Sequence, residues 1–460
     1  MRNPLRVASV LFLIFLAVSL PVVWSGYSEL RQARDVSSYV EAAEHYRAAA
    51  RRIPWRPDLY ELAGHAYYHA ELYALADAAY QKAFRRGALS AEGWVAWGDV
   101  NYLDQKPQRA AELWEQGLHE PNPSEKLYSR LAQTYQENKQ YSKAAQSLQN
   151  YVLVHADDAP ARYRLGLLLT LSDRDAALSE LINASQLDPQ FDPAVQTLRT
   201  ALNLASLNDS PSMRLVITGR GLGLVEEWEL ARAAFEEAVK LDENNAEAWA
   251  WLGEAEQHTA GDEAFLHLEK ALDLNPESAT VRGLRGLYFQ RVGNNRAALD
   301  EFQAAARSEP ENPAWMVSIG ESYSKLGDLI LALEAYQYAV TLAPEQAEYY
   351  RLLAGYCAQN NINIRDVGVP AAQKAVQLAP EDPLALDVLG WLLLLDGRHF
   401  EAERILLQAV ALDPQLASAH FHLALLYFQT DNRAAMYAQL IQARDLGSAE
   451  AGNLLEQYFP

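Results

Sequence analysis

Two pairs of histidines are the residues of this 460-residue chain whose type and spacing most suggest chemistry. His65 and His69 are four apart and would share a helix face with Glu61 one turn earlier, a set that suits a metal ion. His420 and His422 are two apart, so a helix would point them in different directions and they would not chelate together. A solvated helix face is the alternative for the first pair, and we expect no metal site.

Other chemical signals are weak or missing. Residues 219–223 read Gly-Arg-Gly-Leu-Gly, but they lie in a helical pattern, whereas loops that bind phosphates or dinucleotides follow a strand. No G-x-S-x-G, H-E-x-x-H or G-x-x-x-x-G-K motif occurs. The single cysteine, Cys357, forms no internal disulfide and supplies no Cys-based zinc or iron–sulfur site. We therefore expect a protein that is not an enzyme and that binds no cofactor.

Composition indicates a folded, acidic protein. Half of the residues are hydrophobic, which is enough for a sizeable core. The net charge of −21 repels phosphate backbones, so no nucleic acid partner is expected. The charge is uneven, because residues 25–210 hold 19 basic and 24 acidic side chains, whereas residues 211–460 hold 18 and 36. The acidic residues of the second half form either an ordinary solvated face or a binding surface for a basic partner.

The N-terminus carries an uncharged apolar stretch over residues 7–24. At about 1.5 Å for each residue, a helix of this length nearly spans the roughly 30 Å hydrocarbon core of a bilayer. A signal peptide usually has a shorter apolar region, of about 7 to 15 residues. Residues 1–24 are therefore predicted to be a transmembrane anchor, with a cleaved signal peptide or a buried core helix as the alternatives.

The two flanks of this stretch differ in charge. Arg2 and Arg6 precede it without an acidic neighbour, while the arginines that follow it are offset by Glu29 and Asp35. By the positive-inside rule, we predict that the N-terminus is cytoplasmic and that the rest of the chain lies outside the cytoplasm.

Beyond the apolar stretch, small residues recur at a spacing that is mostly 34. They are Gly64, Gly98, Ala132, Gly166, Gly219, Gly253, Gly286, Gly320, Ala354, Gly390 and Ala424. A second series of mostly small residues runs in step with them, and large apolar residues stand three positions before it, as Tyr80, Trp114 and Phe302 do. Offsets of three, four and seven share a helix face, so each unit has two amphipathic helices that cross at small residues.

This pattern resembles the tetratricopeptide repeat family. The unit that matches best is residues 57–90, where the residues in register are Tyr60, Gly64, Tyr67, Ala76, Tyr80 and Ala83. The resemblance covers about residues 37 to 450. It implies an all-α, right-handed α-solenoid of about eleven tetratricopeptide helix pairs, preceded by one transmembrane helix.

Two breaks interrupt the period: residues 192–211 are inserted between units, and residues 360–364 lie in a unit that is two residues longer. The first break suggests how the solenoid is divided. An N-terminal block, residues 25–210, would begin with a degenerate unit and end with an extra helix at residues 192–211. A C-terminal acidic block, residues 211–460, would end with a helix at residues 449–458 that covers the open end, as solenoids require.

The resemblance implies that the first helices line a concave groove whose side chains select the partner. Some family members hold the carboxylate end of a peptide with a lysine and an asparagine, but this chain has Glu61 and His65 at those positions, and only Lys126 and Arg130 imitate the rest of that clamp. The N-terminal candidates for partner binding are Glu61, His65 and Asp99.

Toward the C-terminus the same groove positions become apolar. The candidates there are Trp391, Leu394, Leu395, Phe421, Leu425 and Phe428. Such a patch would bind an apolar helix or peptide segment, or else the last helix of the chain covers it.

The sequence therefore predicts a membrane-tethered, non-catalytic scaffold or adaptor that binds protein partners through the concave surface of a tetratricopeptide solenoid. The alternative is an accessory subunit of envelope polysaccharide synthesis or export, which rests only on resemblance to other anchored tetratricopeptide proteins.

Overall fold

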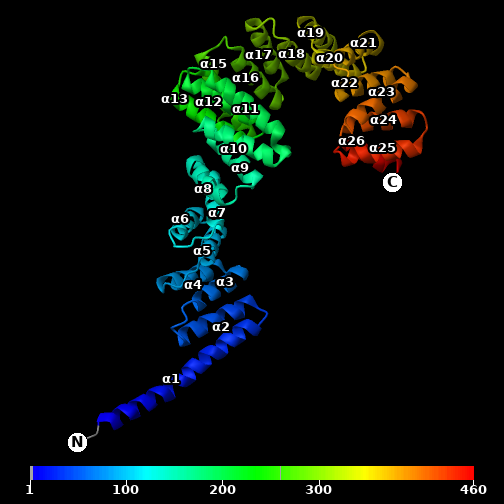
Figure 1. The fold of residues 1–460 in the computed structure, drawn as a ribbon. Helices are drawn as coiled ribbons and strands as arrows, with labels where there is room; N and C mark the ends of the chain where they lie inside the picture. The colour runs from blue at the N-terminus through cyan, green and yellow to red at the C-terminus, as the bar shows by residue number, and fades with distance from the viewer. Residues whose placement is uncertain (1–3, 260, 460) are drawn as a thin grey trace. The chain divides into compact units, whose positions relative to one another are not determined.

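A computed structural model describes residues 4–259 and 261–459, which form 26 α-helices and no strand (Figure 1). This confirms the all-α fold class. The chain divides into two compact units. Unit 1 is Met1–Leu207 with Leu224–Glu226, and unit 2 is Asn208–Gly223 with Glu227–Pro460.

Unit 1 contains the first eleven helices. They are α1 (Pro4–Asp35), α2 (Tyr39–Arg52), α3 (Leu59–His69), α4 (Tyr73–Arg85), α5 (Ala91–Leu103), α6 (Pro107–Leu118), α7 (Lys126–Glu137), α8 (Tyr141–Val154), α9 (Ala159–Leu169), α10 (Arg174–Leu187) and α11 (Asp192–Ser206). Several begin at a side chain that caps the free N–H groups of the first turn, as Ser90 does for α5 and Asp158 for α9.

Unit 2 contains the other helices. They are α12 (Pro211–Leu224), α13 (Trp228–Leu241), α14 (Ala246–His258), α15 (Ala264–Leu274), α16 (Ala279–Arg291), α17 (Asn295–Ser308), α18 (Pro313–Leu326), α19 (Leu329–Leu342), α20 (Ala347–Asn360), α21 (Val369–Leu378), α22 (Pro383–Leu395), α23 (His399–Leu412), α24 (Ala417–Gln429), α25 (Arg433–Asp445) and α26 (Ala449–Tyr458). A π-helical turn, Ile364–Gly368, precedes α21, in the unit where the sequence is two residues longer than the period.

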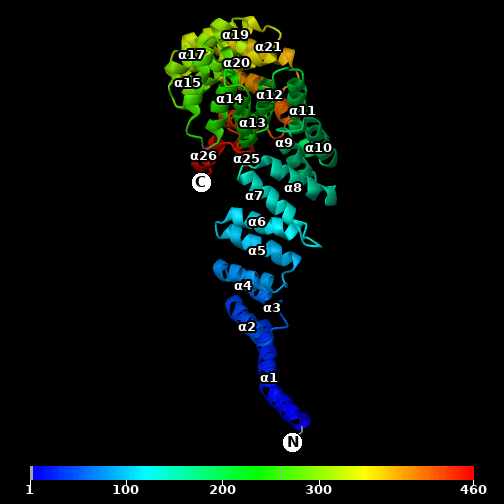
Figure 2. The ribbon, with the colours of Figure 1, turned by 90° about the vertical axis from the view of Figure 1, so that its left-hand side faces the viewer.

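Within each unit, consecutive helices pack as pairs, and each pair packs on the next. The rows α3–α4, α5–α6 and α7–α8 are visible in Figure 2. The first helices of successive pairs also contact one another directly, as α3 does with α5, α14 with α16, and α20 with α22. The first helices therefore line one continuous side of each unit, called its inner side below.

Small residues at the crossings explain the 34-residue series. A Cβ atom added to Gly98 on α5 would lie 1.9 Å from Nε1 of Trp114 on α6. One added to Gly286 on α16 would lie 2.5 Å from Cε1 of Phe302 on α17. The large side chain of the second helix thus occupies the space that a side chain on the first helix would need.

Helix α1 continues well past residue 24, where the sequence places the end of the anchor. An 18-residue window within its Leu13–Asp35 part has a mean hydropathy of 1.5, so the helix is long and apolar enough to cross a membrane, a criterion that an N-terminal signal sequence also meets. Beyond the apolar stretch, Leu30 and Ala33 are buried, and α1 packs along α2. The second half of α1 therefore serves as the first helix of the opening pair.

Replacing Gly286 with alanine should lower the free energy of unfolding by about 1 to 3 kcal/mol, because the new methyl group overlaps the Phe302 ring. Ala305→Leu, at a fully buried position of α17, should lower the free energy of unfolding by a similar amount. The matched control is Gly355→Ala on α20, where an added Cβ meets nothing within 4 Å. That variant should be neutral or stabilised by up to about 1 kcal/mol. Urea unfolding of the three variants measures this, and equal effects of the two alanine variants would contradict the assigned crossing.

Candidate functional site

The nine residues predicted to bind a partner all lie on first helices. In unit 1, α3 carries Glu61 and His65, and α5 carries Asp99. In unit 2, α22 carries Trp391, Leu394 and Leu395, and α24 carries Phe421, Leu425 and Phe428. They therefore form two separate groups, one on each unit.

Glu61 is buried between two helix pairs. Its carboxylate accepts hydrogen bonds from the backbone N–H of Ser90, at 2.7 Å, and from the Ser90 hydroxyl, at 2.5 Å, and contacts Nε2 of His65 at 3.4 Å. The other ring nitrogen of His65 lies 2.9 Å from the hydroxyl of Tyr80. Burial, the largest influence, raises the pKa of Glu61, but the hydrogen bonds from His65 and Ser90 together outweigh it and lower the pKa. Through Ser90, which caps α5, Glu61 thus links α3 to the first turn of α5.

His69 and His422, one from each histidine pair of the sequence, pack against side chains of neighbouring helices. The ring of His69 lies 5.2 Å from that of Tyr39, and His422 Nδ1 lies 2.7 Å from a carboxylate oxygen of Asp387. In the part of the chain that the structure describes, no three His, Cys, Asp or Glu side chains come together as a metal-binding group.

A pocket of about 200 Å³ opens beside Asp99 on the inner side of unit 1. It is lined by Tyr68, Asp99, Tyr102, Leu103, Trp114, Arg130, Gln133 and Thr134. The guanidinium of Arg130 donates two hydrogen bonds to Asp99, at 2.8 and 3.3 Å, and these raise the pKa of Arg130. Burial, followed by the charge of Asp99, raises the pKa of Tyr68. The pocket has the size of a single side chain, and its walls are aromatic rings with an ion pair between them.

The two cations that imitate a carboxylate clamp already have partners. Lys126 Nζ lies 3.0 Å from a carboxylate oxygen of Glu92, and Arg130 is paired with Asp99. Both acidic residues come from α5, the preceding first helix. A free carboxylate would therefore have to displace an acidic side chain at either position.

The C-terminal group differs in exposure from residue to residue. The Trp391 ring stacks on His422 with 4.6 Å between ring centroids. Leu394 is 2% exposed and lies in the hydrophobic core, so it offers no surface to a partner. By contrast, Leu395 is 39% exposed and Phe428 is 47% exposed.

The last helix contacts the part of this group that lies on α24. Leu455 of α26 belongs to the buried cluster against which Phe421 packs, and the Tyr458 ring lies 5.1 Å from the Phe428 ring. Trp391 packs instead against the core of the preceding pairs, together with Leu425. The last helix thus reaches Phe421 and Phe428.

Sequence reasoning missed a network of buried charges in unit 2. Arg285 on α16 pairs with Glu269 of α15 and with Glu301 of α17. Arg291 Nη1 also donates to the buried carboxylate of Glu254, at 2.7 Å. These pairs join different helices, and Glu254 and Arg291 stand 37 positions apart, which is not the period of the repeat, so the sequence pattern gives no signal for them.

Comparison with known families agrees with the repeated helix pairs. Residues 225–279 and 284–347 match the family model described as "Tetratricopeptide repeat". Both ranges lie almost entirely in unit 2. The chain therefore contains tetratricopeptide repeats in this region, and the same spacing of small residues continues on either side of it.

Individual relatives are distant. Mouse (Mus musculus) Superkiller complex protein 3 is 26% identical over 216 residues, which are 45% of this chain and 13% of that protein. Mouse protein O-mannosyl-transferase TMTC3 is 22% identical over 204 residues, 44% of this chain and 20% of that protein. Yeast Tom70 has a crystal structure that is similar over 96% of this chain and 95% of its own, with 16% identity and a TM-score of 0.43. The chain thus spans only a small part of the curated relatives that it matches, and one of them is a transferase by name.

The lowered pKa of Glu61 predicts a pH-dependent contribution to stability. Because the folded pKa lies below the ordinary value of 4.5, the carboxylate stabilises the fold above that pH, and the contribution is lost as the pH falls through the lowered pKa. Glu61→Gln should lower the free energy of unfolding by about 1 to 3 kcal/mol at pH 7 and cost progressively less below pH 4.5.

Urea unfolding from pH 7 down to pH 3 measures the effect, since it follows both proteins through that range. Ser90→Ala provides the partner for a double-mutant cycle, in which the two changes should not be additive. A cost of Glu61→Gln that does not vary with pH would contradict the assignment.

Proposed function

We propose that this protein is a membrane-tethered, non-catalytic scaffold that binds protein partners on the inner sides of its tetratricopeptide units. The observation that carries the proposal is the row of first helices, which brings residues from many repeats to one side of each unit. Such a surface suits an extended segment or a helix of a partner, because its side chains follow one another at regular intervals.

Two places on the inner sides are the proposed contact sites. The pocket beside Asp99 and Arg130 would take one side chain of a partner of unit 1. On unit 2, Trp391, Leu395 and Phe428 retain exposed apolar surface, which suits an apolar segment. Leu394 is not part of this proposal, because it lies in the core.

The tether is α1. Its apolar side chains are widely exposed, with Leu13, Phe15 and Val18 each between 63% and 65% exposed, and a bilayer would cover them. A partner captured by the repeats would then be held at a membrane surface.

Isolation of the full-length protein from native membranes would identify the partners. Recovery of stable protein complexes that contain no enzyme activity of the chain itself supports a scaffold. Consistent recovery of glycosyltransferases or exporters would instead support the accessory role in polysaccharide synthesis or export.

The double change Trp391→Ala with Phe428→Ala should weaken capture of the main partner of unit 2 at least roughly tenfold, because a buried aromatic anchor commonly contributes about 2 kcal/mol or more. The matched control is Phe400→Ala, a residue that is 82% exposed on α23, a second helix. Capture and thermal unfolding are measured on the same variants. If the double variant still captures the partner but is less stable, the partner does not bind at Trp391 and Phe428, and Glu61, His65 and Asp99 become the candidate contacts.

The orientation of α1 can be tested with reporters joined after Pro460. With the N-terminus in the cytoplasm, a phosphatase that is active only outside the cytoplasm should be active there, because the repeats follow the span. A fluorescent protein that folds only in the cytoplasm should be dark at the same position. The reverse result would overturn the predicted orientation, and release of the repeats from the membrane would show that α1 is cleaved.

A further inference from the structure

One end of unit 1 is basic, although the chain has a net charge of −21. Helix α2 runs back along α1, so its end lies beside Gly26, just after the apolar stretch. A Cβ atom added to Gly26 would lie 2.9 Å from Cγ2 of Ile53 and 3.1 Å from Cβ of Arg52. The loop between α2 and α3, residues 53–58, therefore begins at the level where the apolar part of α1 ends.

The end of α4 reaches the same place. Ala83 packs in one buried cluster with Leu30 of α1 and Ile53. From this end of α4, Lys82 Nζ lies 6.0 Å and Arg86 Cζ lies 5.3 Å from the centre of the Tyr60 ring. The six cations gathered here are called the basic end: Arg51, Arg52, Arg56, Lys82, Arg85 and Arg86.

The acidic groups near the basic end are already engaged. Glu29 pairs with His45 and Arg52, and Asp58 accepts two hydrogen bonds from Arg56. Glu61 is buried and bonded to Ser90. Among the residues that the structure describes, no carboxylate forms an ion pair with the other four cations, which are Arg51, Lys82, Arg85 and Arg86. The basic end thus has a surplus of positive charge.

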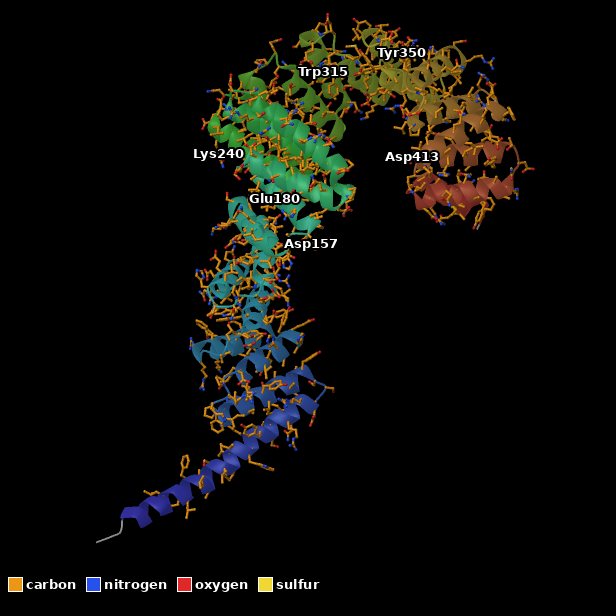
Figure 3. All side chains as sticks on the ribbon, in the orientation of Figure 1. Asp157, Glu180, Lys240, Trp315, Tyr350 and Asp413 are labelled. Atoms are coloured by element: carbon orange, nitrogen blue, oxygen red, sulfur yellow. The ribbon has the colours of Figure 1, made fainter. Side chains whose placement is uncertain are left out.

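The equivalent ends of later pairs in unit 1 are acidic, which makes the basic end specific to the pairs next to α1. The loop between α6 and α7 carries Glu120 and Glu125, and the loop between α8 and α9 carries Asp157 and Asp158. Asp157 is labelled in Figure 3. Repetition of the fold does not explain the change of sign, so the location beside α1 is the feature that the six cations share.

Aromatic side chains accompany the cations. Trp24 and Tyr27 on α1 are 77% and 46% exposed, and Trp55 in the α2–α3 loop is 56% exposed. Tryptophan and tyrosine favour the interface between a membrane and water, because their rings are apolar and their edges carry a polar group. Exposed rings at the end of an apolar helix, with cations around them, match the chemistry of a headgroup layer.

We propose that the basic end binds the anionic headgroups of the bilayer that α1 crosses, with Trp55 in the interface. This rests on the proposed function, which makes α1 a membrane anchor. Arg51, Lys82, Arg85 and Arg86 pair with lipid phosphates, and α1 keeps them close to the surface, so that the first two helix pairs lie against the membrane. Unit 1 is then held by two attachments, a crossing helix and a surface contact, and cannot rotate freely about α1.

The test uses the full-length protein in vesicles of phosphatidylcholine with or without phosphatidylglycerol. An environment-sensitive fluorophore is attached at Trp55→Cys. The control is Tyr39→Cys, at the opposite end of α2 and equally exposed at 56%. The native Cys357 is buried, and burial raises its pKa to about 11, so it does not take up the label.

We expect the label at residue 55 to shift to shorter wavelength and to be quenched by a lipid-borne quencher only in vesicles that contain phosphatidylglycerol. The label at residue 39 should stay in water in both kinds of vesicle. Added salt should reverse the shift, because exposed charges are screened. Arg51→Glu with Arg85→Glu and Arg86→Glu should abolish it, whereas Arg109→Glu on α6 should not.

Flotation of the vesicles separates the two proposals. If the protein floats with the vesicles but the label at residue 55 is as exposed to water as the label at residue 39, the proposed surface contact is wrong and the proposed anchor is supported. A shift of equal size in both kinds of vesicle would also overturn recognition of anionic lipid. If the protein does not float with either kind of vesicle, the anchor and the surface contact are both wrong.

Discussion

The fold depends on one contact that is made again in pair after pair, the approach of a glycine on the first helix to a large side chain on the second. The large residue stands sixteen positions after the glycine in Gly64 with Tyr80, in Gly98 with Trp114 and in Gly286 with Phe302. Because the glycine has no side chain, the ring lies directly against the backbone of the facing helix. This contact brings the two helices of a pair close together. The first helix of each pair also contacts the first helix of the next pair.

The spacing of small and large residues is therefore the part of the structure that the sequence reveals. It predicted the helix pairs, because an offset of three, four or seven is visible without knowing the fold. The continuation of α1 to Asp35 was not predicted, because hydropathy falls after residue 24 and the burial of Leu30 and Ala33 depends on α2. Local pattern locates a helix face, whereas the length of a helix can be decided by what packs on it.

The sequence predicts the candidate sites less well than the helix pairs, because the surroundings of a side chain also depend on the helices that pack against it. Arg130 looks like half of a peptide clamp when its position alone is considered, but Asp99, 31 positions earlier, pairs with it. Leu394 shares the groove register with Leu395, yet it is buried and its neighbour is exposed. The register of a repeat identifies a side of the helix. It does not specify which charged groups meet across two helices or how far a given side chain is covered.

The basic end also bears on the orientation of α1. The positive-inside rule concerns charges that lie close to a span while the chain is being inserted. At that stage the charges that count are Arg2 and Arg6 before the span and Arg31 and Arg34 after it. The cations of the basic end come from residues 51–86 and reach the level of Gly26 only when α2 and α4 have packed. Folding follows synthesis of the segment, so these charges act after the orientation has been chosen. The same protein can thus follow its linear flanks during insertion and still present a cationic face to the membrane afterwards, since that face requires only anionic lipid in the leaflet on the side of the repeats.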